Sequence, residues 1–212
     1  KSFSIPADLV KRMFLKALPL MANEFFWSIS LTLRNQCYAT RGIDVVAAQN
    51  ICSTIFNVFS VVYMSLGSAI AIVVGNQLGA GEIERARDTD RKMIAFSVVC
   101  ATGIGLFLIS LAQVFPLLYK APDEVRSLAA FMIVVNSCAL PFFAYGHSAY
   151  FTLRSGGRVG ITFLFDSVYM WILVLPLSFV LSRFTGMNIH LLFAICQSTE
   201  AIKAALGLFV LN

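Results

Sequence analysis

The sequence predicts an all-α, polytopic membrane protein, built as a bundle of six transmembrane helices. Of its 212 residues, 58% are apolar and only 13% are charged, whereas soluble domains have about 45–50% apolar and about 25% charged residues. The mean hydropathy of +0.81 is too high for a globule that needs charge on its water-facing surface. Composition therefore disfavours a soluble enzyme, a disordered tail and a secreted disulfide scaffold.

Long runs with few charges define the expected helices, because a bilayer core about 30 Å thick needs roughly 20 apolar helical residues. The first run contains Glu24, the fifth contains Asp166 alone, and the last contains Glu200 and Lys203. None of the runs alternates as the strands of a membrane barrel would. The expected spans are 12–38, 45–76, 93–118, 126–152, 160–182 and 189–211.

Basic residues predict the orientation of these spans. One set of alternate loops and ends collects ten of them: Lys1, Lys11, Arg12, Lys16, Arg85, Arg87, Arg91, Lys92, Arg154 and Arg158. The opposite side collects five: Arg34, Arg41, Lys120, Arg126 and Arg183. The positive-inside rule then places both ends of the chain and loop 77–92 in the cytoplasm. The chain begins and ends abruptly, so we expect it to be part of a larger protein.

Motifs for other kinds of chemistry are missing from the sequence. The five cysteines include no C-x-x-C pair, and His147 and His190 are the only histidines, so no metal site is expected. No phosphate-binding loop or hydrolase motif occurs, and an enzyme is not expected. The net charge of +5 is attributed to membrane-flanking loops rather than to nucleic-acid binding.

Glu24 is the leading candidate for a functional residue. It lies near the middle of the first span, and helical spacing puts Trp27 and Ser28 on the same face. A charge inside a bilayer is costly, so it normally faces a partner or water and often marks a transport pathway. A carboxylate beside an aromatic ring can bind a cation or exchange a proton. The alternative is a structural Glu hydrogen-bonded across helices.

Other polar groups within the spans leave similar alternatives. Asp166, with Tyr169 one turn later, suits either a functional site or an interhelical hydrogen bond. Glu200 and Lys203 are three residues apart and are expected to neutralise each other. A stripe of mostly polar residues along the second span either forms hydrogen bonds to a neighbouring helix or is part of a cavity wall. Its members are Gln49, Ser53, Asn57, Ser60 and Met64.

The run Gly-Asn-Gln-Leu-Gly-Ala-Gly-Glu occupies residues 75–82, between the second and third spans. It resembles a cytoplasmic loop of the multidrug and toxic compound extrusion (MATE) transporters. The runs 19–28, 152–157 and 165–171 also match, so the resemblance covers essentially the whole chain. The residues taken to mark the family loop are Gly75, Asn76, Gly79, Ala80 and Gly81.

The resemblance implies the C-terminal six-helix lobe of a twelve-helix antiporter, whose N-terminal lobe this chain lacks. Such proteins exchange organic cations or drugs for Na⁺ or H⁺, need no other cofactor, and lie in the cell membrane in contact with lipids. The cation-binding carboxylate of the family's seventh helix falls on Glu24, and we add Asp166, Trp27, Asn57 and Tyr169 as candidate binding residues. A second acidic ligand of one subgroup is missing, because 142–144 reads Phe-Phe-Ala.

The expected function is therefore efflux by alternating access between two lobes. The nearest alternative is a lipid-linked oligosaccharide flippase of related architecture, which should carry several cationic residues along its cavity. A structural membrane module and a membrane enzyme are more distant alternatives. The coupling ion, Na⁺ or H⁺, stays open.

Overall fold

The computed structural model describes residues 7–157 and 159–211, and within them it contains helices and no strands. Lys1 and Arg158, two of the residues used to predict the orientation, lie outside the described residues. The helices are α1 (Ala7–Ala39), α2 (Ile43–Gly79), α3 (Ile83–Leu111), α4 (Asp123–Ser155), α5 (Val159–Phe163), α6 (Leu175–Phe184) and α7 (Ile189–Leu211). A 3₁₀ turn covers Phe115–Leu118, and two π-helical segments, Leu164–Val168 and Met170–Val174, connect α5 to α6.

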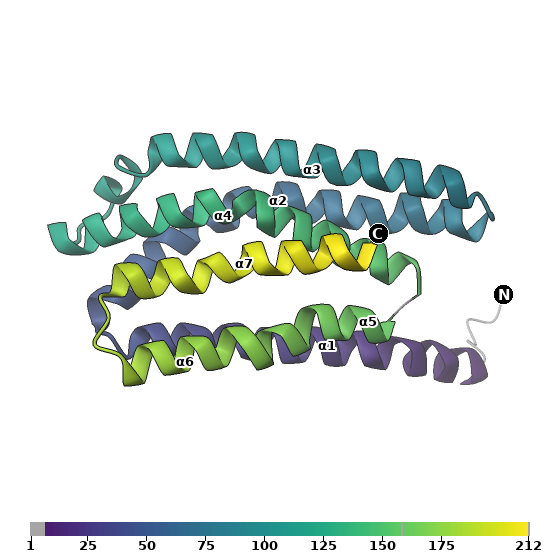
Figure 1. The fold of residues 1–212 in the computed structure, drawn as a ribbon, viewed down its shortest axis with the longest axis horizontal. Coiled ribbons are helices and arrows are strands. Elements are labelled where there is room, and N and C mark those ends of the chain that lie inside the picture. The colour runs from purple at the N-terminus through teal and green to yellow at the C-terminus, as the bar shows by residue number, and fades with distance from the viewer. Residues whose placement is uncertain (1–6, 158, 212) are drawn as a thin grey trace.

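The helices run up and down in one bundle (Figure 1). Helix α4 packs against α2, α3 and α7, while α1 packs along the α5–α6 run. Helix α7 lies between these two groups (Figure 1). The α2–α3 and α4–α5 connections lie at the same end as the end of α7, and the other connections lie at the opposite end (Figure 1). This alternation agrees with the predicted order of crossings.

Each predicted span corresponds to a helix or, for the fifth, to the α5–α6 run. The boundaries differ at α3, which begins at Ile83 and ends at Leu111, not at 93 and 118. Residues 83–92 are helical although they are charged, so the α2–α3 connection is much shorter than predicted. At its other end the helix stops before Pro116, because a proline ring clashes with the carbonyl four residues earlier.

Five helical segments are long and apolar enough to cross a membrane: Ile43–Gly79, Ile83–Leu111, Asp123–Ser155, Gly160–Phe184 and Ile189–Leu211. The first helix is not among them, because polar side chains such as Asn23 and Glu24 interrupt its apolar sequence. The span predicted for 12–38 therefore stays a prediction. Its packing along the α5–α6 run places it in the bundle with the other five.

The residues of the family loop form the end of α2 and the turn after it. Gly81 has a φ of +80° and follows the capping residue Ala80. The Gly81 amide donates to the Leu78 carbonyl and the Glu82 amide donates to the Gln77 carbonyl, which is the Schellman pattern. Gly75 and Asn76 lie in the last turns of α2, and Gly79 ends the helix. The turn between α2 and α3 thus begins directly after Gly79.

Candidate functional site

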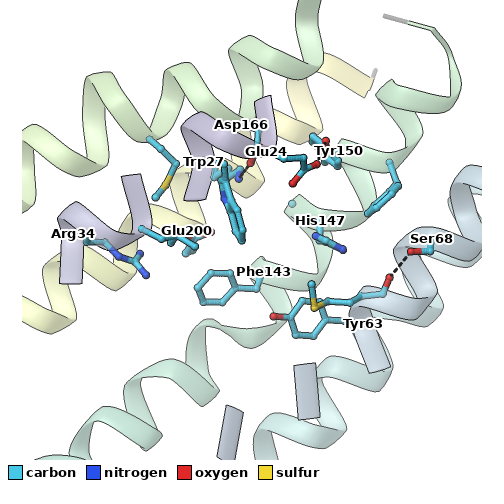
Figure 2. Close-up of a pocket in the computed structure, with 16 residues that line it drawn as sticks. Glu24, Trp27, Arg34, Tyr63, Ser68, Phe143, His147, Tyr150, Asp166 and Glu200 are labelled. Carbon is cyan, nitrogen blue, oxygen red and sulfur yellow. Dashed lines mark hydrogen bonds and ion pairs between the residues drawn. The ribbon is translucent and has the colours of Figure 1, made fainter. Parts of the chain in front are cut away.

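A cavity of about 270 Å³ lies where α1, the π-helical segments and α7 face α2 and α4 (Figure 2). Its size is near the lower end of the range for ligand pockets. Aromatic side chains from α1, α2 and α4 form much of the wall, among them Trp27, Tyr63 and Phe143. Five charged residues also line it: Glu24, Arg34, Asp166, Glu200 and Lys203. An apolar wall with a few charged groups is typical of a small-molecule site.

Asn23 connects the polar groups at one side of the cavity. Its Nδ2 donates to Asp166 Oδ2 and to the Tyr150 hydroxyl, both at 3.3 Å. The Ser167 hydroxyl donates to Asn23 Oδ1 at 2.6 Å, and the Tyr150 hydroxyl donates to Glu24 Oε1 at 2.8 Å. The network therefore joins α1, α4 and the first π-helical segment. It fixes the two leading carboxylates, Glu24 and Asp166, relative to each other.

Asp166 forms an ion pair with Lys203 across two helical segments. Lys203 Nζ lies 2.7 Å from Asp166 Oδ1, and the two side chains are only 12% and 11% exposed. Glu200 and Lys203, which were expected to neutralise each other, do interact electrostatically, but the short ion pair of Lys203 is with Asp166. A three-residue spacing along one helix gives only a weak interaction, whereas a short bond to Asp166 compensates two buried charges at once.

Glu24 is more open than Asp166. Its side chain is 55% exposed among the described residues, and the nearest cation is Arg154, with Nη1 at 4.0 Å. This distance and exposure make the ion pair weak. Glu24 is thus a carboxylate in the cavity wall whose charge is only loosely compensated.

The backbone around Asp166 departs from the predicted continuous helix. Leu164–Val168 and Met170–Val174 are π-helical, and Pro176 lies in the first turn of α6 directly after them. Proline removes a backbone donor and crowds the carbonyl four residues before it, which favours a wider hydrogen-bond register upstream. Such π-helical insertions are frequent at functional sites.

The structure separates the predicted site residues into two groups. Glu24, Trp27 and Asp166 line the cavity, but Asn57 and Tyr169 do not. Asn57 is exposed on α2, and its backbone carbonyl accepts a hydrogen bond from Ser60. The Tyr169 hydroxyl donates to the Thr199 carbonyl within a buried cluster. Their predicted binding roles therefore gain no support from their positions.

The members of the polar stripe on the second span have different structural roles. Gln49 donates to Asn35 Oδ1 at 2.8 Å and so connects α2 to α1. Ser53 and Ser60 instead donate to backbone carbonyls of their own helix. The fifth member, Met64, lines the cavity. The stripe thus combines one interhelical contact with one contribution to the cavity wall.

Sequence reasoning missed several residues of the wall. Arg34 was counted with the loop charges, yet it lies in α1 and lines the cavity. Tyr150 carries no charge and stands in no motif, and His147 is one of only two histidines, with no metal-binding motif around it, yet both line the cavity. His147 does pack, with its ring centroid 5.7 Å from that of Tyr63 and 4.9 Å from that of Phe151. Within residues 7–157 and 159–211, no group of three metal-ligating side chains comes together.

Comparison with solved structures gives the same fold. A crystal structure of MATE in complex with MaL6 matches with a TM-score of 0.83 and 14% identity, over 99% of this chain and 47% of that one. An outward-facing multidrug resistance MATE family transporter of the MOP superfamily matches with a TM-score of 0.79 and 15% identity, over 100% and 48%. A MOP superfamily transporter from Pyrococcus furiosus Vc1 matches with a TM-score of 0.82 and 13% identity, over 91% and 42%.

The chain spans less than half the length of each of these structures. A family comparison is more specific than the shared fold, because it rests on the sequence itself. The MatE family model matches residues 19–180, which run from within α1 through α2, α3, α4 and both π-helical segments into α6. The chain therefore belongs to the MATE family of membrane transporters.

Proposed function

We propose that this chain is one lobe of a secondary active exporter, which moves organic cations or drugs across the cell membrane in exchange for Na⁺ or H⁺. The observation that carries the proposal is the cavity, where Glu24, Asp166 and Glu200 lie among aromatic side chains. Carboxylates attract a positively charged group, and aromatic faces add cation–π and dispersion contacts. Glu24 is the principal binding carboxylate because its charge is only loosely compensated.

The second part of the proposal is alternating access. The solved relatives are about twice as long as this chain, so their remaining length is enough for a second lobe, which would complete the cavity. Transport would follow from rocking of the two lobes around the site between them, which is the common design of transporters built from repeats. The two π-helical segments, one of which contains Asp166, lie directly before Pro176. They form an irregular region at which the helix can bend during transport.

Competition at the carboxylates gives a physical basis for exchange. An ion or proton that binds Glu24 neutralises it and weakens its hold on a cationic substrate, and the substrate in turn displaces the ion. Phe143, in the stretch where one subgroup of the family has a second acidic ligand, lines the cavity as an aromatic residue. This chain would therefore bind the ion with a different set of groups from that subgroup.

The flippase alternative gains one feature from the structure, because Arg34 joins Lys203 in the cavity wall. A lipid-linked oligosaccharide carries phosphate, which needs uncompensated cations. Lys203 is already paired with Asp166 at 2.7 Å, and three carboxylates share the cavity. This balance favours an exporter of positively charged molecules.

The proposal is tested with the full-length protein in liposomes loaded with ethidium. An imposed proton or sodium gradient should drive dye movement, and the gradient that does so identifies the coupling ion. Protein-free liposomes under the same gradients are the control. Dye movement equal to that control under every gradient would contradict the exporter function. Gradient-independent movement of a phospholipid analogue in the same liposomes would instead support the flippase.

A further inference from the structure

We propose that the groove between the α5–α6 run and α7 holds one anionic phospholipid, with an acyl chain along the groove and the phosphate at Arg183. The groove has a volume of about 520 Å³ and lies between two segments that are each long and apolar enough to cross a membrane. These two segments run next to each other through the bundle (Figure 1). Binding here is separate from the proposed transport, because among the described residues the groove and the charged cavity share no lining residue.

The walls of the groove are apolar. Leu173, Pro176 and Val180 form the wall on the side of α6, and Ile195 and Ile202 face them from α7. Val180 and Ile202 are both 47% exposed, so the groove is open to the medium that surrounds the protein. For a protein of a membrane transporter family, that medium is lipid. An acyl chain gains dispersion contacts from both walls of such a groove.

The polar side chains of the groove are already satisfied by their own helix. The Ser198 hydroxyl donates to the Ile195 carbonyl, and the Thr199 hydroxyl donates to the Cys196 carbonyl, both at 2.7 Å. Neither hydroxyl therefore has a proton left to donate to a polar ligand. The groove offers contacts for hydrocarbon, which distinguishes it from the charged cavity.

The length of the groove matches one leaflet of a bilayer. Ile172, at its inner end, lies about 16 Å from Arg183 along the helix axis, at about 1.5 Å per residue. The hydrocarbon of one leaflet is about 15 Å thick, which is half of the bilayer core. Val180, at the outer end of the groove, comes three residues before Arg183, so the two lie on one side of α6. A phospholipid with its phosphate at Arg183 can therefore extend one acyl chain along the whole groove.

Arg183 supplies the charge that a phosphate needs. It lies exposed in the last turn of α6, and it forms no ion pair with any residue that the structure describes. Its guanidinium lies 5.7 Å from the centre of the Phe179 ring, which holds the side chain against the end of the helix. A guanidinium can bind a phosphate through two parallel hydrogen bonds. This charge favours an anionic lipid over a neutral one.

The second lobe is less suited than a lipid to fill the groove. On α7, the cavity that a second lobe would complete is lined by Glu200 and Lys203, whereas the groove is lined by Ser198 and Ile202. At about 100° per residue, these two pairs lie on different sides of the helix. A lobe placed over the cavity therefore leaves the groove open to lipid.

Two lipids with identical acyl chains test the role of Arg183. The purified full-length protein is titrated with dioleoyl phosphatidylglycerol, which is anionic, or with dioleoyl phosphatidylcholine, which is zwitterionic, and bound lipid is measured by native mass spectrometry. We expect phosphatidylglycerol to bind more tightly. Arg183→Gln should raise the Kd of phosphatidylglycerol by about tenfold, the usual worth of one charged hydrogen bond, and should change that of phosphatidylcholine less. Lys120→Gln is the matched control, because it removes one exposed positive charge from the α3–α4 connection at the same end of the bundle (Figure 1).

Filling the groove tests where the acyl chain lies. Ile202→Trp places a larger side chain in the groove and should weaken the binding of both lipids. Leu106→Trp, at an exposed apolar position of α3 outside the groove, is the control and should weaken neither. The melting temperature of each variant separates loss of lipid binding from loss of folding.

A photocrosslink identifies the occupant of the groove. In a cysteine-free background of the full-length protein, Ser198→Cys is labelled with benzophenone maleimide and irradiated in native membranes, and the labelled peptide is analysed by mass spectrometry. A phospholipid adduct is expected. A crosslink to the second lobe or to another copy of the protein would overturn the lipid site. Equal effects of Arg183→Gln and Lys120→Gln on phosphatidylglycerol, or unchanged binding of both lipids by Ile202→Trp, would also overturn it.

Discussion

Lys203 on α7 and Asp166 in the first π-helical segment are joined by a 2.7 Å ion pair that is almost completely shielded from solvent. Asp166 also accepts a hydrogen bond from Asn23 at 3.3 Å, so three separate segments meet at one carboxylate. Breaking a buried ion pair leaves an uncompensated charge, which in soluble proteins costs about 3–5 kcal/mol. The pair therefore holds α7 and the first π-helical segment together at the cavity wall, and it also balances one negative charge there with one positive charge.

Removal of one partner of this pair should destabilise the protein more than removal of both. Lys203→Met leaves the Asp166 carboxylate without its cation, whereas Lys203→Met with Asp166→Asn leaves two neutral groups. The melting temperature of the purified full-length protein should thus be lower for the single variant than for the double variant. An additive loss in the double variant would contradict an energetic link between the two residues.

Asp166→Asn alone tests whether the carboxylate serves packing or transport. It keeps the size of the side chain but leaves the Lys203 ammonium without a counter-charge. We expect lower expression, lower dye efflux, or both. Wild-type levels of expression and efflux in this variant would exclude both roles for Asp166.

Gly105 is expected to be intolerant of a side chain, because α3 and α4 approach closely there. A Cβ at Gly105 would lie 2.7 Å from the backbone carbonyl oxygen of Ser137, whereas a Cβ at Gly103 would meet nothing within 4 Å. Gly105→Ala should therefore lower the melting temperature, by an amount equivalent to about 1–3 kcal/mol for overpacking. Gly103→Ala is the matched control on the same helix and should be neutral or slightly stabilising. Equal melting temperatures for the two variants would contradict the close approach.

The orientation in the membrane can be tested at the turn after α2. The ten-to-five distribution of basic residues predicts that residues 77–92 face the cytoplasm. In a cysteine-free background of the full-length protein, a single cysteine at Asp88 should react with a membrane-impermeant maleimide only after the cells are permeabilised. Asp88 is exposed near the start of α3, so poor access would not explain a negative result. Labelling of intact cells would reverse the predicted orientation.

The long runs with few charged residues were sufficient to predict the helices, because a segment that crosses a bilayer must be mostly apolar. It failed where the backbone changes for local reasons, as at Pro116, which ends α3 early, and in the π-helical segments before Pro176. Residues 83–92 also continue α3 although they are polar. Hydropathy detects the membrane span, whereas the helix itself extends beyond it.

The site was predictable only in part. Glu24, Trp27 and Asp166 stand out because charged or amphipathic side chains within spans are rare, and all three line the cavity. The partner of Lys203 was not predictable, since a contact between residues 37 positions apart depends on tertiary packing. Tyr150 and Asn23 are uncharged, and only the folded arrangement shows that they connect Glu24 to Asp166.

Tyr150 is expected to position Glu24 for substrate binding. Tyr150→Phe removes the hydroxyl that donates to Glu24 at 2.8 Å but keeps the ring that packs between the helices. The apparent KM for a cationic dye should rise by a few-fold to about tenfold, the range for loss of one charged hydrogen bond. The measurement is the concentration dependence of efflux in the full-length protein. A KM equal to that of the wild type would show that Glu24 needs no such support.

The central claim, that Glu24 is the binding or coupling carboxylate of this lobe, is tested most directly by Glu24→Gln. The substitution keeps the size and the hydrogen bond from Tyr150 but removes the charge and the exchangeable proton. Ethidium efflux is measured against expression over a range of external pH and sodium concentrations, with Glu84→Gln, an exposed carboxylate outside the cavity, as control. We expect the Glu24 variant to insert normally and to lose about tenfold or more of its efflux under all conditions. Wild-type efflux from Glu24→Gln under every condition would contradict the claim.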